Sequence, residues 1–267
     1  MLFNCEEFGT LAFALLFPVI YTKGPSWVSY YTKFVIYYAS LTLTSSVILP
    51  FSLLRPKDSR NLLWSNRLMK MTSALLGIQW KGPERPLCHG PAVIVINHQS
   101  SIDILGLLCE LLPLMEGQVT IVAKKSLLYA GPFGLLAYMS GVTFIERSKS
   151  EEAKKVLNEA VEHCKRNNWK MVVFPEGTRH HHPDQLDMLP FKLGAFNAAI
   201  QGEIPVQPIV FSHYNFYDNT AKVLDPGVIR IHVLDTQDCS QTDDAKTLAL
   251  LTRAKMLDVF KEDEKRH

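Results

Sequence analysis

Short apolar runs alternate with longer amphipathic segments from residue 90 onward. Six of these runs are rich in β-branched and aromatic residues and have the length of buried strands. Several segments between them place apolar residues at helical spacing. This alternation predicts an α/β fold, in which a mostly parallel sheet is flanked by helices. The predicted strands are residues 92–96, 119–123, 142–145, 171–174, 206–211 and 228–234.

Two of the predicted helices have a recognisable start. Ser148 and Glu151 precede a periodic apolar segment and have the spacing of a capping box. Thr242, Asp243 and Asp244 precede the last periodic segment, and we expect the final helix to begin there.

The first 57 residues differ from the rest of the chain. Residues 9–21 are apolar but short for a full membrane span, whereas residues 34–54 carry no charge over 21 positions. The second segment is long enough to cross the hydrocarbon core as a helix. We therefore predict an N-terminal membrane anchor over residues 1–57, with one or two hydrophobic helices, and a second domain over residues 58–267. The alternative for the second segment is a buried core helix, although such helices usually have a polar face.

Basic residues follow the second apolar segment, against a single acid, Asp58. By the positive-inside rule, the chain after residue 54 is expected on the cytosolic side. Glu6 and Glu7 precede the first segment, where a cleaved signal peptide would carry positive charge, so we expect that segment to be retained. It either crosses the membrane or lies in the interface as part of a monotopic anchor. The basic residues are Arg55, Lys57, Arg60, Arg67 and Lys70.

A stretch at residues 126–145 also lacks charge. Gly131, Pro132 and Gly134 interrupt it, so it is a poor straight membrane helix. We expect two short core elements joined by a turn. The alternative is an apolar wall or a shallow membrane contact beside a lipid site.

The composition excludes some classes of protein. A net charge of +2 over 267 residues argues against a nucleic-acid partner, which usually requires a dense basic face. Apolar residues make up 47% of the chain and the mean hydropathy is +0.04, which favours contact with membrane lipid. The five cysteines are scattered without a CxxC pair, so neither a disulfide framework nor a zinc site is predicted.

His98 and Asp103 follow the first predicted strand, which ends at Asn97. Positions five apart do not share one face of a helix, so the two side chains can meet only across a strand-to-helix turn. In such a turn the carboxylate reaches one imidazole nitrogen. We expect Ser100 or Ser101 to cap the helix that follows.

Such a pair has a chemical use. A carboxylate on one imidazole nitrogen fixes the tautomer and stabilises the imidazolium that forms when the other nitrogen takes a proton. Free N–H groups at the helix start would also steady a developing oxyanion. We therefore interpret the pair as a general base and the group that orients it, with a structural hydrogen bond as the alternative. A metal site is not favoured, because no second His or Cys stands nearby at ligand spacing.

A second polar turn follows the strand at residues 171–174. It contains Glu176, Gly177, Thr178 and Arg179, and Arg147 ends another strand. Ligands gather at the carboxyl ends of strands in an open α/β sheet. Because a guanidinium offers a fork that matches phosphate, the two arginines together predict a phosphate site.

The sequence is similar to the glycerolipid acyltransferase family, and within it to the 1-acylglycerol-3-phosphate O-acyltransferases, because it contains four sequence blocks of that family in the family's order. A lone HxxxxD would be weak, but four ordered blocks with FPEGTR intact are a specific signal. The resemblance covers about residues 90 to 215. The blocks are NHQSSID (97–103), GVTFIER (141–147), FPEGTR (174–179) and IPVQPIVF (204–211).

The resemblance implies the roles of particular residues. In that family the block matched by residues 97–103 carries the catalytic pair, which maps to His98 and Asp103. The second block implies that Arg147 binds substrate. The third implies contacts to the glycerol phosphate of the acceptor from Glu176, Gly177, Thr178 and Arg179.

The resemblance also implies the reaction. An acyl chain passes from acyl-CoA to the sn-2 hydroxyl of lysophosphatidic acid, which gives phosphatidic acid and CoA without a cofactor or a metal. It further implies an endoplasmic reticulum membrane enzyme whose catalytic domain faces the cytosol. Another lysophospholipid as acceptor, and a lipid-binding membrane protein without catalysis, stay as alternatives. A hydrolase is disfavoured, because no GxSxG elbow is present.

One local feature lies outside the blocks. His180, His181 and His182 are consecutive, so they cannot all point at one ion, and we expect a polar loop there rather than a metal site. Lys124, Lys125 and Lys192 are further candidates for phosphate contacts.

Overall fold

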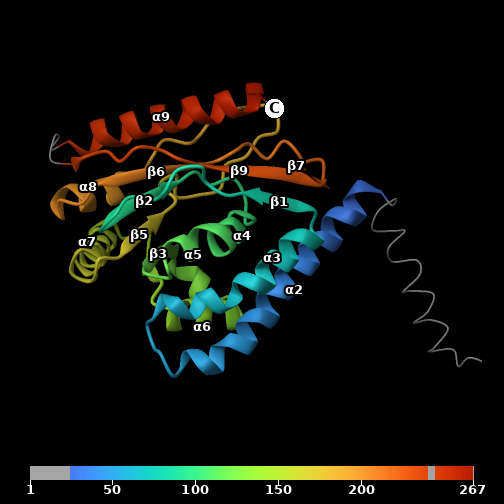
Figure 1. The fold of residues 1–267 in the computed structure, drawn as a ribbon, viewed down its shortest axis with the longest axis horizontal. Helices are drawn as coiled ribbons and strands as arrows, with labels where there is room; N and C mark the ends of the chain where they lie inside the picture. The colour runs from blue at the N-terminus through green and yellow to red at the C-terminus, as the bar shows by residue number, and fades with distance from the viewer. Residues whose placement is uncertain (1–24, 240–243, 267) are drawn as a thin grey trace, which may run out of the picture.

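The computed structural model describes residues 25–239 and 244–266 (Figure 1). The predicted apolar segment at residues 9–21, and Thr242 and Asp243 at the predicted start of the last helix, lie outside the described residues.

A seven-stranded sheet forms the centre of the fold, in the order β1-β9-β6-β2-β5-β3-β4. Its neighbouring strands are parallel except for β6 and β9, which are antiparallel. The predicted α/β fold with a mostly parallel sheet is therefore confirmed. A separate hairpin pairs β7 with β8. The strands are β1 (Ile78–Lys81), β2 (Ala92–Ile96), β3 (Val119–Lys124), β4 (Thr143–Ile145), β5 (Lys170–Val173), β6 (Val206–Phe211), β7 (Tyr217–Asp218), β8 (Val223–Leu224) and β9 (Gly227–Val233).

Helices cover both faces of the sheet (Figure 1). Those on one face include the amino-terminal helices, and those on the other include the carboxyl-terminal helix. The helices are α2 (Ser26–Ser52), η1 (Ser59–Ser65), α3 (Asn66–Leu75), α4 (Asp103–Gly106), η2 (Leu107–Leu111), α5 (Leu112–Leu114), η3 (Lys125–Tyr129), α6 (Gly131–Met139), α7 (Ser150–Asn167), α8 (Gly194–Gln201) and α9 (Ala245–Arg266).

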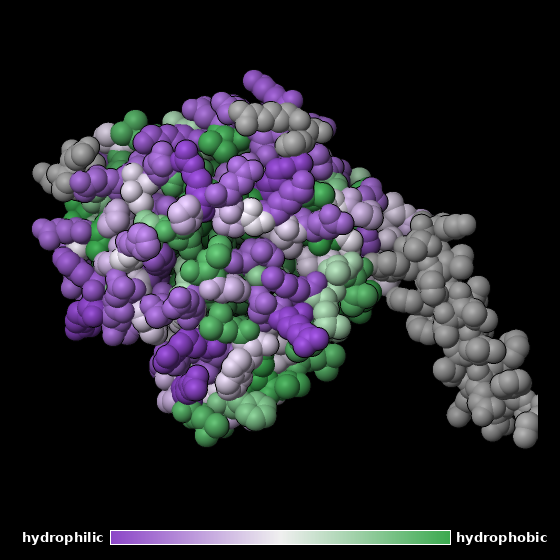
Figure 2. Space-filling view, viewed as in Figure 1, coloured by the Kyte–Doolittle hydropathy of each residue, from purple (hydrophilic) through white to green (hydrophobic). Residues whose placement is uncertain are grey.

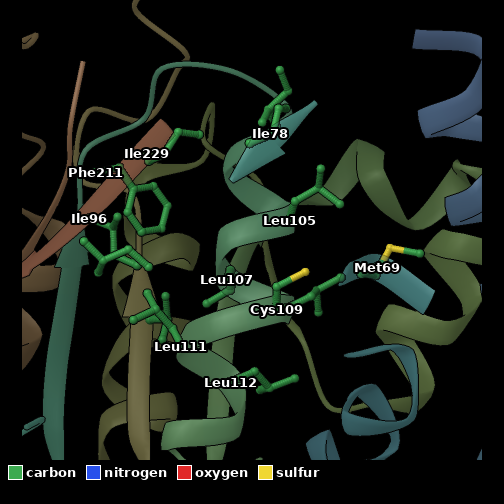
Figure 3. Packing of buried hydrophobic residues seen from close by; sticks show 14 of the residues in the cluster. Met69, Ile78, Ile96, Leu105, Leu107, Cys109, Leu111, Leu112, Phe211 and Ile229 are labelled. Carbon is green, nitrogen blue, oxygen red and sulfur yellow. The ribbon is translucent and has the colours of Figure 1, made fainter. Parts of the chain in front are cut away.

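Strand β2 shows how the sequence builds two cores. All five of its residues are buried, which explains why the run is continuously apolar instead of alternating. Ile94 and Ile96 point to the core shared with α2, α3 and α4, whereas Val93 and Val95 point to the core shared with α7, α8 and α9. Figure 3 shows Ile96 and its neighbours in the first core. Each such side chain contributes about 1.5–3 kcal/mol when it leaves water.

Helix α2 packs along α6 and against α3, and it is tied to the body of the fold by polar groups. The Tyr37 hydroxyl donates to the Ser101 carbonyl at 2.6 Å, and Lys33 Nζ donates to the Leu224 carbonyl at 2.6 Å. Among the described residues, α2 is the helix long and apolar enough to cross a membrane. The division at residue 57 stays a prediction.

Large apolar side chains on the outer face of α2 and on the turn that follows it are exposed. In Figure 2 hydrophobic residues gather at the lower end of the view, where α2 ends in Figure 1. A surface of this kind supports association with a membrane. The exposed residues of this region are Val35, Leu43, Val47, Phe51, Leu53 and Leu54.

The uncharged stretch at residues 126–145 forms η3, α6 and β4, so it consists of short elements joined by turns. Gly134 allows the close approach of η3, because a Cβ there would lie 2.4 Å from the carbonyl oxygens of Leu127 and Leu128. Tyr129 and Leu135 are exposed, and a membrane contact at this surface stays a prediction.

The helix starts differ in detail from the predicted ones. Helix α7 begins at Ser150, and the Ser148 hydroxyl donates to Glu146 instead of capping the helix. At the start of α9, Asp244 accepts hydrogen bonds from the N–H groups of Lys246 and Thr247 at 3.0 and 3.1 Å.

Candidate active site

The turns after β2 and β5 lie side by side, because these strands are parallel neighbours with Val95 opposite Val173. His98 follows β2 and Glu176 follows β5, so the sheet brings the two conspicuous polar turns together. This edge is where an open α/β sheet binds its ligands.

His98 and Asp103 form the hydrogen bond that their spacing predicts. His98 Nδ1 lies 2.6 Å from Asp103 Oδ2, and the carboxylate is fully buried while the imidazole is 18% exposed. Since a carboxylate oxygen only accepts, Nδ1 carries the hydrogen, and Nε2 is left as the proton acceptor. The ring also stacks on Phe174, with ring centroids 4.3 Å apart.

The carboxylate of Asp103 also gathers backbone donors. Oδ2 accepts hydrogen bonds from the N–H groups of Gln99 at 2.8 Å and Ser100 at 3.1 Å. The expectation that N–H groups at this turn would be free for an oxyanion is wrong for these two, because the buried carboxylate takes them. The predicted serine cap is also absent from α4, which begins at Asp103, and Ser100 Oγ accepts from Ile102 N–H at 3.4 Å.

Glu176 is buried between two backbone segments. Its Oε1 accepts from His98 N–H at 2.7 Å and its Oε2 accepts from Leu189 N–H at 2.9 Å. Burial raises the pKa of Glu176 to about 7, and the two N–H donors offset only part of that effect. Both oxygens therefore have partners within the protein, and the side chain is 3% exposed. Its position supports the turn that carries His98.

Arg147 and Gly177 meet, although β3 separates β4 from β5 in the sheet. The Arg147 guanidinium donates to the Gly177 carbonyl, and burial lowers the pKa of this arginine. Gly177 has a φ of +72°, a conformation that side chains of L-residues rarely adopt. The Lys192 side chain would lie 3.4 Å from a Cβ at position 177.

A groove of about 1230 Å³ opens beside the His98 turn, between that turn and α2. Ser100, Ser101, Thr178 and Arg179 line its polar part. Neither His98 nor Arg147 lines this groove. Arg179 therefore faces the groove, whereas Arg147 does not. The side chains of α2 on the groove are mostly aromatic or apolar: Tyr30, Tyr31, Phe34, Val35, Tyr38, Ala39, Thr42 and Leu43.

The three consecutive histidines have separate partners. His180 N–H donates to the His98 carbonyl at 2.7 Å, His181 Nε2 lies 2.7 Å from the Tyr217 carbonyl, and the His182 carbonyl lies 3.2 Å from His213 Nε2. Across residues 25–239 and 244–266, no group of three or more His, Cys, Asp or Glu side chains is placed to hold a metal ion.

The family model described as Acyltransferase matches residues 77–212, which include the two polar turns after β2 and β5 and Arg147. The chain belongs to the acyltransferase family. It is 33% identical to the 1-acyl-sn-glycerol-3-phosphate acyltransferase alpha of Homo sapiens, over 92% of this chain and 86% of that protein. It is 34% identical to the beta form of Homo sapiens, over 86% of this chain and 82% of that protein.

A solved structure shows the same fold. The 1-acyl-sn-glycerophosphate (LPA) acyltransferase PlsC from Thermotoga maritima superposes with a TM-score of 0.63 at 19% identity. The match covers 90% of this chain and 95% of that one. In this acyltransferase, the α/β core therefore follows an architecture known from experiment.

Sequence reasoning missed the residues that hold the His98 turn from the side of β6. The Asn97 side chain pairs with the backbone of Phe211, accepting from its N–H at 2.8 Å and donating to its carbonyl at 3.0 Å. The Tyr214 hydroxyl donates to Asp103 Oδ1 at 2.7 Å. The position of Asn97, a polar residue directly after a buried strand, could have indicated its role. No sequence pattern indicated the role of Tyr214, because its contact with Asp103 depends on the order of the strands in the sheet.

Proposed function

We propose that this acyltransferase moves an acyl chain from acyl-CoA to the sn-2 hydroxyl of lysophosphatidic acid, giving phosphatidic acid and CoA. The observation that carries the proposal is the His98–Asp103 pair, whose geometry leaves Nε2 as the proton acceptor. Relatives that share most of their length with this chain are named as 1-acyl-sn-glycerol-3-phosphate acyltransferases.

His98 acts as the general base. Nε2 takes the proton of the acceptor hydroxyl while its oxygen attacks the thioester carbonyl, and Asp103 stabilises the imidazolium. The tetrahedral intermediate collapses with cleavage of the C–S bond, and the departing thiolate takes the proton from His98. No protein group is acylated, so Ser100 and Ser101 serve the shape of the turn.

Arg179 is the residue best placed for the acceptor phosphate, because it lines the groove together with Thr178. Gly177 shapes the turn that presents them. Arg147 supports this turn through the Gly177 carbonyl and adds positive charge to the site. Glu176 contributes by fixing the backbone at His98. The apolar chain of the acceptor fits the aromatic face that α2 gives to the groove.

The exposed apolar surface of α2 brings this site to its lipid substrate. We place the protein at the endoplasmic reticulum membrane with the domain of residues 58–267 facing the cytosol and residues 1–57 as its anchor. Fractionation and protease protection of tagged protein in cells test this placement. Digestion of the carboxyl-terminal tag only after the vesicles are opened would contradict it.

The reaction is tested with purified protein in detergent, oleoyl-CoA and radiolabelled lysophosphatidic acid. Labelled phosphatidic acid should form together with one equivalent of CoA. A panel of other lysophospholipids tests the acceptor head group. CoA release without any acceptor would indicate a hydrolase, and binding of lipid without product would indicate a non-catalytic lipid-binding protein.

A further inference from the structure

Tyr214 lies in the loop after β6, outside the four sequence blocks, and is fully buried. We infer that Tyr214 is a positioning residue for acyl transfer, whose hydroxyl holds the Asp103 carboxylate in the orientation and charge state that His98 requires. The inference rests on the function proposed above, because it concerns the same site.

The two oxygens of Asp103 have unequal surroundings. Oδ2 meets His98 Nδ1 and the N–H groups of Gln99 and Ser100, at 2.6, 2.8 and 3.1 Å. Oδ1 accepts a hydrogen bond from the Tyr214 hydroxyl at 2.7 Å, and the carboxylate is closed to solvent. Without that hydroxyl a carboxylate oxygen closed to solvent loses its hydrogen-bond donor, which is costly for a charged group.

The backbone of Tyr214 is held on the same turn. Its N–H donates to Gln99 Oε1 at 3.2 Å, and Gln99 Nε2 donates to the Ser212 carbonyl at 2.9 Å. The ring packs against Phe216, with centroids 5.7 Å apart. A phenylalanine at position 214 therefore keeps these backbone bonds and the ring packing, and removes only the hydroxyl.

Loss of the Tyr214 hydroxyl should change the pH at which the His98–Asp103 pair takes up a proton in one direction only. With a neutral imidazole the His98–Asp103 pair carries one negative charge, and proton uptake at Nε2 brings the pair to zero. A donor on Oδ1 stabilises the negative state more than the neutral one. Removing the donor favours proton uptake by the pair, so the base is lost at a higher pH than in the wild type.

Other titratable groups also face the pair. Tyr37 approaches Asp103 from α2, Glu176 faces both His98 and Asp103 from the turn after β5, and His181 faces Asp103 from the loop that follows. Burial lowers the pKa of His181 and raises that of Glu176 to about 7. These groups are the same in the wild type and in Tyr214→Phe, so the difference between the two reports the hydroxyl.

Tyr37→Phe is the matched control. Tyr37 is also a buried tyrosine that contacts this turn, from α2, but its hydroxyl donates to the Ser101 carbonyl and not to the carboxylate. A purely structural loosening of the turn is expected from both variants. A change in proton uptake by the pair is expected from Tyr214→Phe alone.

The first measurement is the pH dependence of kcat for full-length protein in detergent, with lysophosphatidic acid and oleoyl-CoA. In Tyr214→Phe the acidic limb should move up by about one pH unit, while both KM values stay within about twofold. Tyr37→Phe should keep the wild-type limb. An unmoved limb in Tyr214→Phe, or the same movement in both variants, overturns the inference.

A second measurement does not depend on turnover. NMR titration of ¹⁵N-histidine-labelled protein gives the midpoint of the His98 imidazole, assigned by the signal missing in His98→Ala. This midpoint should rise in Tyr214→Phe and not in Tyr37→Phe. If the wild type lacks transferase activity, the proposed function fails, and the midpoints still decide whether Tyr214 acts on the pair.

Discussion

Glu176 accepts a hydrogen bond from the backbone N–H of His98 at 2.7 Å, so the turn after β5 holds the turn after β2. The second oxygen of Glu176 holds Leu189 N–H, beyond the histidine loop. One buried carboxylate thus joins the turn after β2 to both ends of the loop that follows β5. Because the pKa of Glu176 is about 7, the charge of this carboxyl changes near neutral pH.

Ionisation of Glu176 should lower stability as the pH rises. Its pKa is raised from 4.5 to about 7, so between these values the folded protein binds more protons than the unfolded chain. Stability therefore falls through this window, by on the order of 3 kcal/mol in total. In Glu176→Gln this contribution disappears, because the amide does not ionise. Thermal unfolding of both proteins in detergent from pH 5 to 8 measures the difference.

The control for this prediction is Glu203→Gln, which changes an exposed carboxylate paired with Lys165. That variant should follow the wild-type pH dependence. A constant gap between the wild type and Glu176→Gln at every pH would contradict the prediction.

His98→Ala should lose nearly all transferase activity while the protein still folds. The imidazole is the base of the proposed reaction, and removal of a general base costs roughly 10²–10⁴-fold in rate. Activity at equal protein concentration is the measurement, with His163→Ala on the exposed side of α7 as the control. Activity within about threefold of the wild type would rule out the assignment of the base.

Asp103→Asn should lower kcat and leave the acceptor KM nearly unchanged. Asparagine keeps the shape, and its amide can face the Tyr214 oxygen, but the charge that stabilises the imidazolium is lost. We expect a fall in kcat of roughly 10²–10⁴-fold. Steady-state kinetics with varied lysophosphatidic acid separates the two parameters. If Asp103→Asn has the kcat of the wild type, the role of Asp103 is structural and not catalytic.

The sequence predicted the α/β class and the main central strands because those strands are continuous apolar runs. It also predicted the His98–Asp103 contact, since a strand-to-helix turn is the geometry that lets positions five apart meet. It did not reveal β1, whose four residues alternate in burial, or the short hairpin of β7 and β8. Strand β1 depends on β9, a partner far along the chain, whereas β7 and β8 are two-residue strands that pair only with each other.

The surroundings of the pair were harder to predict than the pair itself. A glutamate in a polar turn suggests a ligand contact, but Glu176 is buried on two backbone N–H groups. Tyr214 meets Asp103 from 111 positions away. Local patterns identify a residue that begins or ends an element. They do not show which side chain a neighbouring strand brings to it.

Arg179→Ala should weaken use of the acceptor far more than use of the donor. The guanidinium lines the groove beside Ser101 and Thr178, where we place the phosphate of lysophosphatidic acid. Charge-assisted hydrogen bonds contribute about 1.5–3 kcal/mol, which is roughly a 10- to 150-fold loss in kcat/KM for the acceptor. Arg179→Lys should recover only part of this loss, because lysine keeps the charge without the fork. The control is Arg85→Ala, whose side chain pairs with Asp235 at the surface. Steady-state kinetics with each substrate varied in turn decides the matter: if the KM for acyl-CoA rises tenfold while that for lysophosphatidic acid does not change, Arg179 belongs to the donor site.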